Sequence, residues 1–163
     1  MRAFDGQRAV FSHEMLLDGS PEEIFPLLCP VREYDWIEEW ECEVIHSHSG
    51  FAELDCVFRT DLPTSGGPET WVVCQYEPPR RIAFVRTGRQ RTMRYSIDLE
   101  VADGSTRATW TQVVTGLDQE GNRALKGPAS STFATIMASL EAKLNHWLRT
   151  GTMLRRPANQ PEE

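Results

Sequence analysis

The sequence lacks long apolar runs, paired cysteines and an excess of positive charge. No stretch approaches the roughly 18 apolar residues that a membrane-spanning helix needs. The first eight residues lack the apolar segment of a secretory signal, so we expect a cytoplasmic protein. The net charge of -7 and the pI near 5.2 argue against a nucleic-acid partner, which would need a positive surface.

Motifs for catalysis and metal binding are also missing. There is no Ser-His-Asp order, no glycine-rich phosphate loop and no H-E-x-x-H run. The cysteines form no C-x-x-C pair, which argues against a zinc ribbon or a thioredoxin-like redox motif. We therefore assign no catalytic residue and expect neither a metal nor a cofactor. The cysteines are read as reduced, mostly buried side chains: Cys29, Cys42, Cys56 and Cys74.

One group of residues offers an alternative metal site. Cys42, His46 and His48 share a face of a predicted strand, and Glu53 and Asp55 lie on the next one. Whether the two groups face each other depends on the length of the turn between the strands. We favour the interpretation without a metal.

What the sequence does contain is enough for one folded unit. A chain of 163 residues buries roughly 68–70% of its unfolded surface without a metal or disulfide. Hydrophobic residues make up 40% of the chain and charged residues 25%, as in ordinary globular proteins. We expect one domain over 1–163, with an ordered core at about 9–150 and a flexible tail at 155–163.

Apolar and polar residues alternate along much of the chain, which indicates half-buried strands. The clearest case is 92–102, where Met93, Tyr95 and Ile97 would share the buried face. Short turn signals such as Pro78-Pro79 separate the strands and favour an antiparallel arrangement. The predicted strands are 10–17, 42–48, 51–61, 69–77, 81–87, 92–102 and 105–116.

Helical signals occur at two places. Ser20, Pro21 and Glu23 form a capping pattern that predicts a short helix ending before Pro30. A second short helical or irregular piece at 31–40 is rich in aromatic residues and suggests a lid. From Pro128, apolar residues recur at helical spacing for about twenty residues, after a loop at 116–127, and Gly151 is placed to cap the end.

This order of elements resembles the START/Bet v1-like (SRPBCC) superfamily of polyketide cyclases and lipid-transport proteins. The resemblance covers about 9–150 and rests on four pieces: 17–25, the tryptophans at 36 and 40, 76–84 and 104–110. It implies an α+β helix-grip fold, in which a seven-stranded antiparallel sheet wraps around the long C-terminal helix and two short helices follow the first strand. A cavity would lie between sheet and helix. The superfamily has no common catalytic set, so none is transferred.

Residues whose side chains would face such a cavity are the candidate ligand contacts. Strand parity points His13, Tyr95 and Gln112 inward, and His13 and Tyr95 are the weak candidates for acid-base chemistry. The inward faces of 42–48 and 69–77 stay open, although we take Trp71 and Gln75 as inward. The full predicted set is His13, Trp36, Trp40, Trp71, Gln75, Tyr95, Gln112, Phe133, Met137 and Leu140.

A local group of basic residues has two interpretations. On a hairpin they would form a solvated sheet edge, which we favour, or they could bind an anionic head group or an acidic partner. The group consists of Arg80, Arg81, Arg86, Arg89, Arg91 and Arg94.

The favoured function is binding of a small, largely hydrophobic ligand, such as a lipid or polyketide. One alternative is an enzyme of the cyclase or dehydratase kind that uses His13 and Tyr95. Another is a chaperone-partner or stress-response module whose surface contact would include Trp36 and Trp40. A homodimer remains open.

Overall fold

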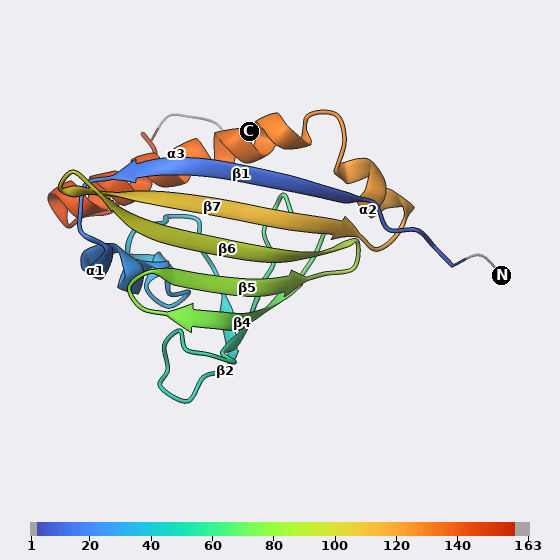
Figure 1. Ribbon diagram of the computed structural model, residues 1–163, viewed down its shortest axis with the longest axis horizontal. Helices are drawn as coiled ribbons and strands as arrows, with labels where there is room; N and C mark the ends of the chain where they lie inside the picture. Colours follow the sequence, from blue (N-terminus) through green and yellow to red (C-terminus); the bar gives the residue numbers. More distant parts are fainter. Residues whose placement is uncertain (1–2, 159–163) are drawn as a thin grey trace.

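Seven strands form one antiparallel sheet in the order β1-β7-β6-β5-β4-β3-β2 in the computed structural model, which describes residues 3–158. The strands are β1 (Arg8–Leu17), β2 (Glu43–His46), β3 (Val57–Thr60), β4 (Glu69–Glu77), β5 (Arg81–Thr87), β6 (Arg91–Ala102) and β7 (Ser105–Gly116). The helices are α1 (Pro21–Ile24), η1 (Phe25–Leu28), η2 (Glu33–Asp35), α2 (Gln119–Ala124) and α3 (Ala129–Thr150). The long helix runs beside β1, and α1 and α2 lie at opposite ends of the sheet (Figure 1). This architecture confirms the predicted α+β class.

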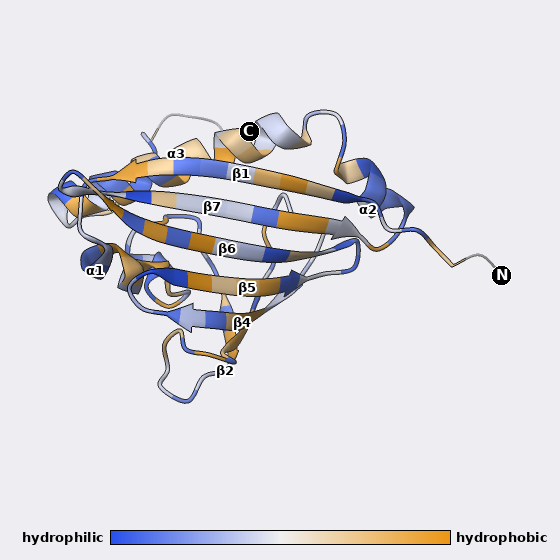
Figure 2. Cartoon of the chain, viewed as in Figure 1, coloured by the Kyte–Doolittle hydropathy of each residue, from blue (hydrophilic) through white to orange (hydrophobic). Residues whose placement is uncertain are grey.

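The two faces of the sheet differ in polarity, as the alternating pattern predicts. Apolar and polar bands alternate along the strands (Figure 2). On β6, Met93, Tyr95 and Ile97 are buried, and on β7 Trp110 and Val114 are buried beside them. The concave face therefore carries the core and the wall of any internal space.

The predicted helix signals are confirmed at both ends of the fold. The Ser20 hydroxyl accepts a hydrogen bond from the Glu23 backbone N–H at 3.2 Å, which caps α1. Gly151 adopts a left-handed conformation with a φ of 68°, and its N–H donates to the Trp147 carbonyl at 2.7 Å. A side chain at this position would be strained, so glycine ends α3 at low cost.

Side chains of α3 hold the helix against the edge strand β1. The Asn145 amide accepts from the Asp18 N–H at 2.9 Å and donates to the Leu16 carbonyl at 3.0 Å. The Glu141 carboxylate accepts from the Leu16 N–H at 2.9 Å. These bonds satisfy backbone groups that would otherwise lack a strand partner.

The predicted strand at 51–61 is wrong in its first half. Only Val57–Thr60 forms β3, and the preceding segment is a loop in which Asp55 has a positive φ of 67°. The Glu53 carboxylate organises this loop by accepting from the His48 and Ser49 N–H groups. Glu53, a candidate metal ligand in the sequence, thus holds the loop closed. The segment before Val57 is therefore a loop and not part of the predicted strand.

The predicted loop at 116–127 is also wrong, because it contains α2. The Asp118 carboxylate caps this helix by accepting from the Gly121 N–H at 2.8 Å. Gly121 packs so tightly that an added Cβ would lie 1.9 Å from the Gln90 carbonyl oxygen. This glycine therefore lets α2 close over the turn between β5 and β6.

The end of the chain lies partly outside the described residues. Of the predicted flexible tail at 155–163, residues 155–158 form no helix or strand, and 159–163 lie outside that range. Within residues 3–158, no helix combines the length and the apolar character that crossing a membrane would take.

Candidate functional site

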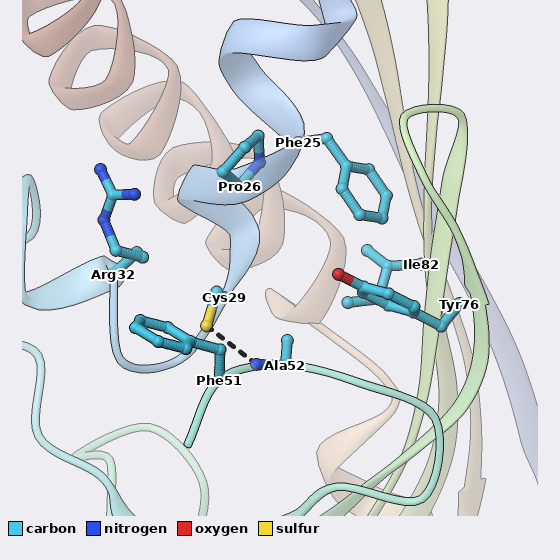
Figure 3. Close-up of a pocket in the computed structure, with 8 residues that line it drawn as sticks. All are labelled: Phe25, Pro26, Cys29, Arg32, Phe51, Ala52, Tyr76 and Ile82. Atoms are coloured by element: carbon cyan, nitrogen blue, oxygen red, sulfur yellow. Dashed lines mark hydrogen bonds between the residues drawn. The ribbon is translucent and has the colours of Figure 1, made fainter. Parts of the chain in front are cut away.

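Two hollows in the fold differ greatly in size. The smaller has a volume of about 140 Å³ and lies between η1, the loop at Phe51 and the end of β4 (Figure 3). Cys29 lies in its wall, where its sulfur accepts a hydrogen bond from the Ala52 N–H at 3.1 Å. The larger has a volume of about 980 Å³. Small-molecule sites usually occupy roughly 300–1,000 Å³, so only the larger hollow has the size of a ligand site.

The larger cavity lies between the concave face of the sheet and α3. A series of stacked and edge-on aromatic rings forms much of the sheet side. Ring centroids are 5.1 Å apart for Phe58 and Trp71, 6.0 Å for Trp71 and Tyr95, and 6.1 Å for Tyr95 and Trp110. Rigid rings leave space open because they cannot collapse into it as flexible chains would. The opposite wall is supplied by Phe133, Met137 and Leu140 of α3.

The structure brings most of the predicted ligand contacts to this cavity. Those in its wall are Trp40, Trp71, Tyr95, Gln112, Phe133, Met137 and Leu140. The remaining three, His13, Trp36 and Gln75, are not among the lining residues.

Each of these three side chains has another position for a physical reason. His13 is half-buried on the inward face of β1, opposite Trp110. Trp36 is fully buried in the core and donates its indole N–H to the Leu27 carbonyl at 2.9 Å. A bulge after Val73 displaces Gln75 from the inward face. Its side-chain amide oxygen accepts a hydrogen bond from Arg81 Nε at 2.8 Å. Sequence parity cannot foresee such a bulge.

Tyr95 and Gln112 provide polar atoms near the middle of the sheet. They are direct partners in the register of β6 and β7. The Tyr95 hydroxyl donates to the Met137 sulfur at 3.7 Å, a weak acceptor. Burial raises the pKa of Tyr95, so the phenol keeps its proton and remains a donor. A ligand oxygen would be a better partner than the sulfur.

Trp110 adds a second donor in the same wall. Its side chain is buried, and its indole N–H has no hydrogen-bond partner among residues 3–158. An unpaired buried donor costs about 1–3 kcal/mol, so such groups normally find a protein, water or ligand acceptor.

Glu33 lines the cavity opposite these strands, and sequence reasoning missed it. No described residue makes a side-chain hydrogen bond or an ion pair with its carboxyl group. Burial raises the pKa of Glu33 well above its usual range, and the nearby Arg86 charge lowers it only in part. The protonated form of this carboxyl group is therefore favoured more than that of an exposed glutamate. No local sequence pattern identifies Glu33 as a cavity residue, because the short η2 helix has no recurring apolar positions.

The Glu33 carboxyl group makes stability depend on pH. The folded state keeps this proton at pH values where the unfolded chain has released it, so stability falls as pH rises above about 4.3. The fall is at most about 1.4 kcal/mol per pH unit and ends at the pKa of the folded state. The facing Tyr95 stays neutral and the Arg86 guanidinium stays charged in this pH range, so neither adds a titration of its own.

Glu33→Gln removes this dependence. Urea unfolding at pH 4, 6 and 8 should therefore show a variant that gains stability relative to the unsubstituted protein as pH rises. The exposed Glu43→Gln serves as the control and should show no such trend. A difference between Glu33→Gln and the unsubstituted protein that stays constant with pH would contradict the buried, neutral carboxyl group.

Arg86 corrects the interpretation of the basic group as a solvated edge. Its side chain is buried at 6% exposure and lines the cavity. Its Nε donates to Glu69 Oε1 at 2.7 Å, and its guanidinium lies 4.4 Å from the Trp71 ring centroid. Glu69 is itself 1% exposed and also accepts from Arg91 Nε at 3.0 Å. The alternation along β5 could have predicted this position, because Ile82, Phe84 and Arg86 lie on the same face of the strand.

The described part of the chain holds no metal-binding cluster. Between residues 3 and 158, no three His, Cys, Asp or Glu side chains come together to hold an ion. The cavity instead offers apolar area with a few polar groups, an arrangement suited to binding an organic molecule.

Comparisons with known proteins identify the fold. No protein-family model matches the chain, and no curated protein is similar to it in sequence. Solved structures are similar in fold at low sequence identity. An uncharacterised protein from Rhizobium leguminosarum matches with a TM-score of 0.66 and 15% identity, over 89% of this chain and 97% of that one.

Two further neighbours carry more informative names. DynU16, from the dynemicin biosynthetic locus, matches with a TM-score of 0.62 and 15% identity, over 88% of this chain and 48% of that one. The Aha1 dimer from Colwellia psychrerythraea matches with a TM-score of 0.57 and 14% identity, over 84% and 96% of the two chains. At such identities only the fold is shared. The chain thus has a seven-stranded antiparallel sheet and a C-terminal helix in an arrangement that fits the helix-grip fold.

Proposed function

We propose that the protein is a START/Bet v1-like domain that binds a small, largely apolar molecule in its internal cavity. The observation that supports this most is the volume of about 980 Å³ between sheet and α3, whose wall combines aromatic and aliphatic side chains with charged ones. Each 100 Å² of apolar ligand surface removed from water would contribute about 2.5 kcal/mol. Part of that gain is lost to the ordering of the ligand.

Polar groups in the wall would set the orientation of the ligand. Tyr95 offers a hydroxyl that donates to a sulfur, a weak acceptor, and Gln112 lies beside it. Trp110 offers an indole N–H without a partner in the described structure. These groups favour a ligand with at least one oxygen acceptor among its apolar atoms.

Binding is better supported than the two alternatives. The enzyme hypothesis needs His13 and Tyr95 to meet at one substrate, and His13 does not line the cavity. The chaperone-partner hypothesis needs tryptophans at the surface. Trp36 has no exposed area, however, and Trp40 faces the cavity.

A larger side chain on α3 that projects into the cavity should weaken binding. Leu140→Trp adds an indole where Leu140 lines the space. We expect this variant to bind the neutral fluorescent probe N-phenyl-1-naphthylamine at least about 10-fold more weakly. Ala138→Trp is the matched control, because Ala138 is exposed on the same helix and does not line the cavity.

Fluorescence titration of the unsubstituted protein and both variants provides the measurement. Equal probe affinity in all three would argue against binding in this cavity. Mass spectrometry of an organic extract of the purified protein would identify a bound molecule. Because the Colwellia neighbour is a dimer, self-association of this chain is part of the proposal, and sedimentation of the same samples tests it.

A further inference from the structure

We infer that the bound molecule is an organic anion, with an apolar body and one carboxylate that pairs with Arg86 in the cavity wall. This inference rests on the proposed function and adds the chemical class of the ligand. It follows from the distribution of charge around the cavity, the geometry of the Arg86 side chain and the environment of Glu33.

The charge of the cavity is opposite to that of the chain. The chain has a net charge of -7. The acidic residues in the lining are Glu33 and Glu39. Six basic side chains line the same space: Arg86, Arg91, Arg123, Lys126, Lys143 and Arg156. An acidic protein that gathers basic groups around one apolar hollow raises the local concentration of anions there.

Ion pairing leaves part of this positive charge uncompensated at the inner end. Arg86 and Arg91 share one carboxylate, that of Glu69. Two guanidinium groups and one carboxylate carry a net charge of +1. Within residues 3–158 the nearby Glu33 makes no ion pair with either arginine, and burial disfavours its charged form. Lys143 and Arg123, in contrast, pair with Glu39 and Glu120, so part of the surplus positive charge lies on the Arg86 side.

The geometry of Arg86 leaves one edge of its guanidinium available. Nε donates to Glu69 Oε1, and Nη2 lies 2.6 Å from the same oxygen. The face of the guanidinium is covered by the Trp71 ring. None of residues 3–158 accepts a hydrogen bond from Nη1, and Arg86 belongs to the cavity wall. Glu69 thus fixes the guanidinium while Nη1 remains free to donate to a ligand.

A carboxylate fits these conditions better than a neutral or cationic group. Transferring an anion into an apolar cavity is costly unless a cation pairs with it and donates hydrogen bonds. Arg86 provides such a group, with the planar donor arrangement that suits carboxylates. A cationic ligand would instead meet an uncompensated positive charge. A neutral ligand could accept a hydrogen bond from Nη1 but would leave the positive charge uncompensated.

The test compares three molecules with the same twelve-carbon chain. Dodecanoate, 1-dodecanol and dodecylammonium are used at pH 7, below their micelle concentrations, to displace N-phenyl-1-naphthylamine. We expect dodecanoate to displace the probe at a concentration at least about 10-fold lower than dodecanol, and dodecylammonium to be weakest. Equal potency of the acid and the alcohol, or preference for the amine, would overturn the inference and leave the proposed function standing. Failure of the probe and all three molecules to bind would overturn both.

A double substitution locates the preference. Glu69→Gln with Arg86→Gln keeps an amide pair in place of the Glu69–Arg86 ion pair. Arg91 stays charged, so the net charge of the cluster is still +1. Loss of the preference for dodecanoate while dodecanol still binds would therefore identify Arg86 itself as the partner. Glu43→Gln with Arg59→Gln is the matched control, because this ion pair is exposed and does not line the cavity. Circular dichroism confirms that both variants fold. A preference that survives in the Glu69/Arg86 variant would rule out Arg86 as the partner of the carboxylate.

Discussion

Glu69→Ala is expected to lower the free energy of unfolding by about 3–5 kcal/mol, because it leaves a buried guanidinium without its partner. Glu69 is 1% exposed and is the carboxylate to which Arg86 and Arg91 both bind. Without it, two like charges would lie close together in a poorly solvated site. Urea denaturation monitored by circular dichroism measures the loss.

Two comparisons make this result specific to the buried cluster. Glu43→Ala removes one member of an exposed ion pair with Arg59 and should cost no more than about 1 kcal/mol. Adding Arg86→Met to Glu69→Ala should recover part of the loss, because the unpaired charge is then reduced to that of Arg91. A Glu69→Ala variant no less stable than Glu43→Ala would mean that the pair is solvated.

Trp36→Ala should have a loss of similar size, about 3–5 kcal/mol, because it opens a void in the core. The indole is fully buried, and its N–H donates to the Leu27 carbonyl. For a chain of this size the midpoint of thermal unfolding should fall by roughly 6–20 °C. Differential scanning calorimetry measures this change.

The same variant separates the two roles considered for Trp36. Val101→Ala, at 70% exposure, is the control and should change stability by about 0.5 kcal/mol or less. If Trp36→Ala instead kept its unfolding temperature and bound N-phenyl-1-naphthylamine more weakly, Trp36 would be a ligand contact, as the sequence predicted.

The sheet and the long helix were predictable because their signals are local. Alternation in β6 and β7 placed Tyr95, Trp110 and Gln112 on the inner face, and helical spacing did the same for Met137 in α3. Such patterns depend only on the geometry of one element. They located most of the cavity wall without information on how the elements pack.

The polar part of the site depends on contacts between distant residues. Glu69 on β4 and Arg86 on β5 are 17 residues apart in the sequence. Glu33 belongs to a single turn of 3-10 helix. An arginine near a turn is usually solvated, so the sequence favoured a solvated environment for Arg86, whereas the side chain is buried. Loops raise the same difficulty. The carboxylate of Glu53 closes the segment at 47–56 through contacts that no periodicity encodes.

The bonds from α3 to β1 affect what can associate with the outer border of the sheet. A free border strand can recruit a strand from another molecule, and this is a common route to aggregation. The N–H and carbonyl groups of Leu16 and the N–H of Asp18 are already occupied by Glu141 and Asn145. An intruding strand would have to displace the helix there before it could pair. At this end of β1, the helix that covers the hollow interior therefore also blocks strand pairing.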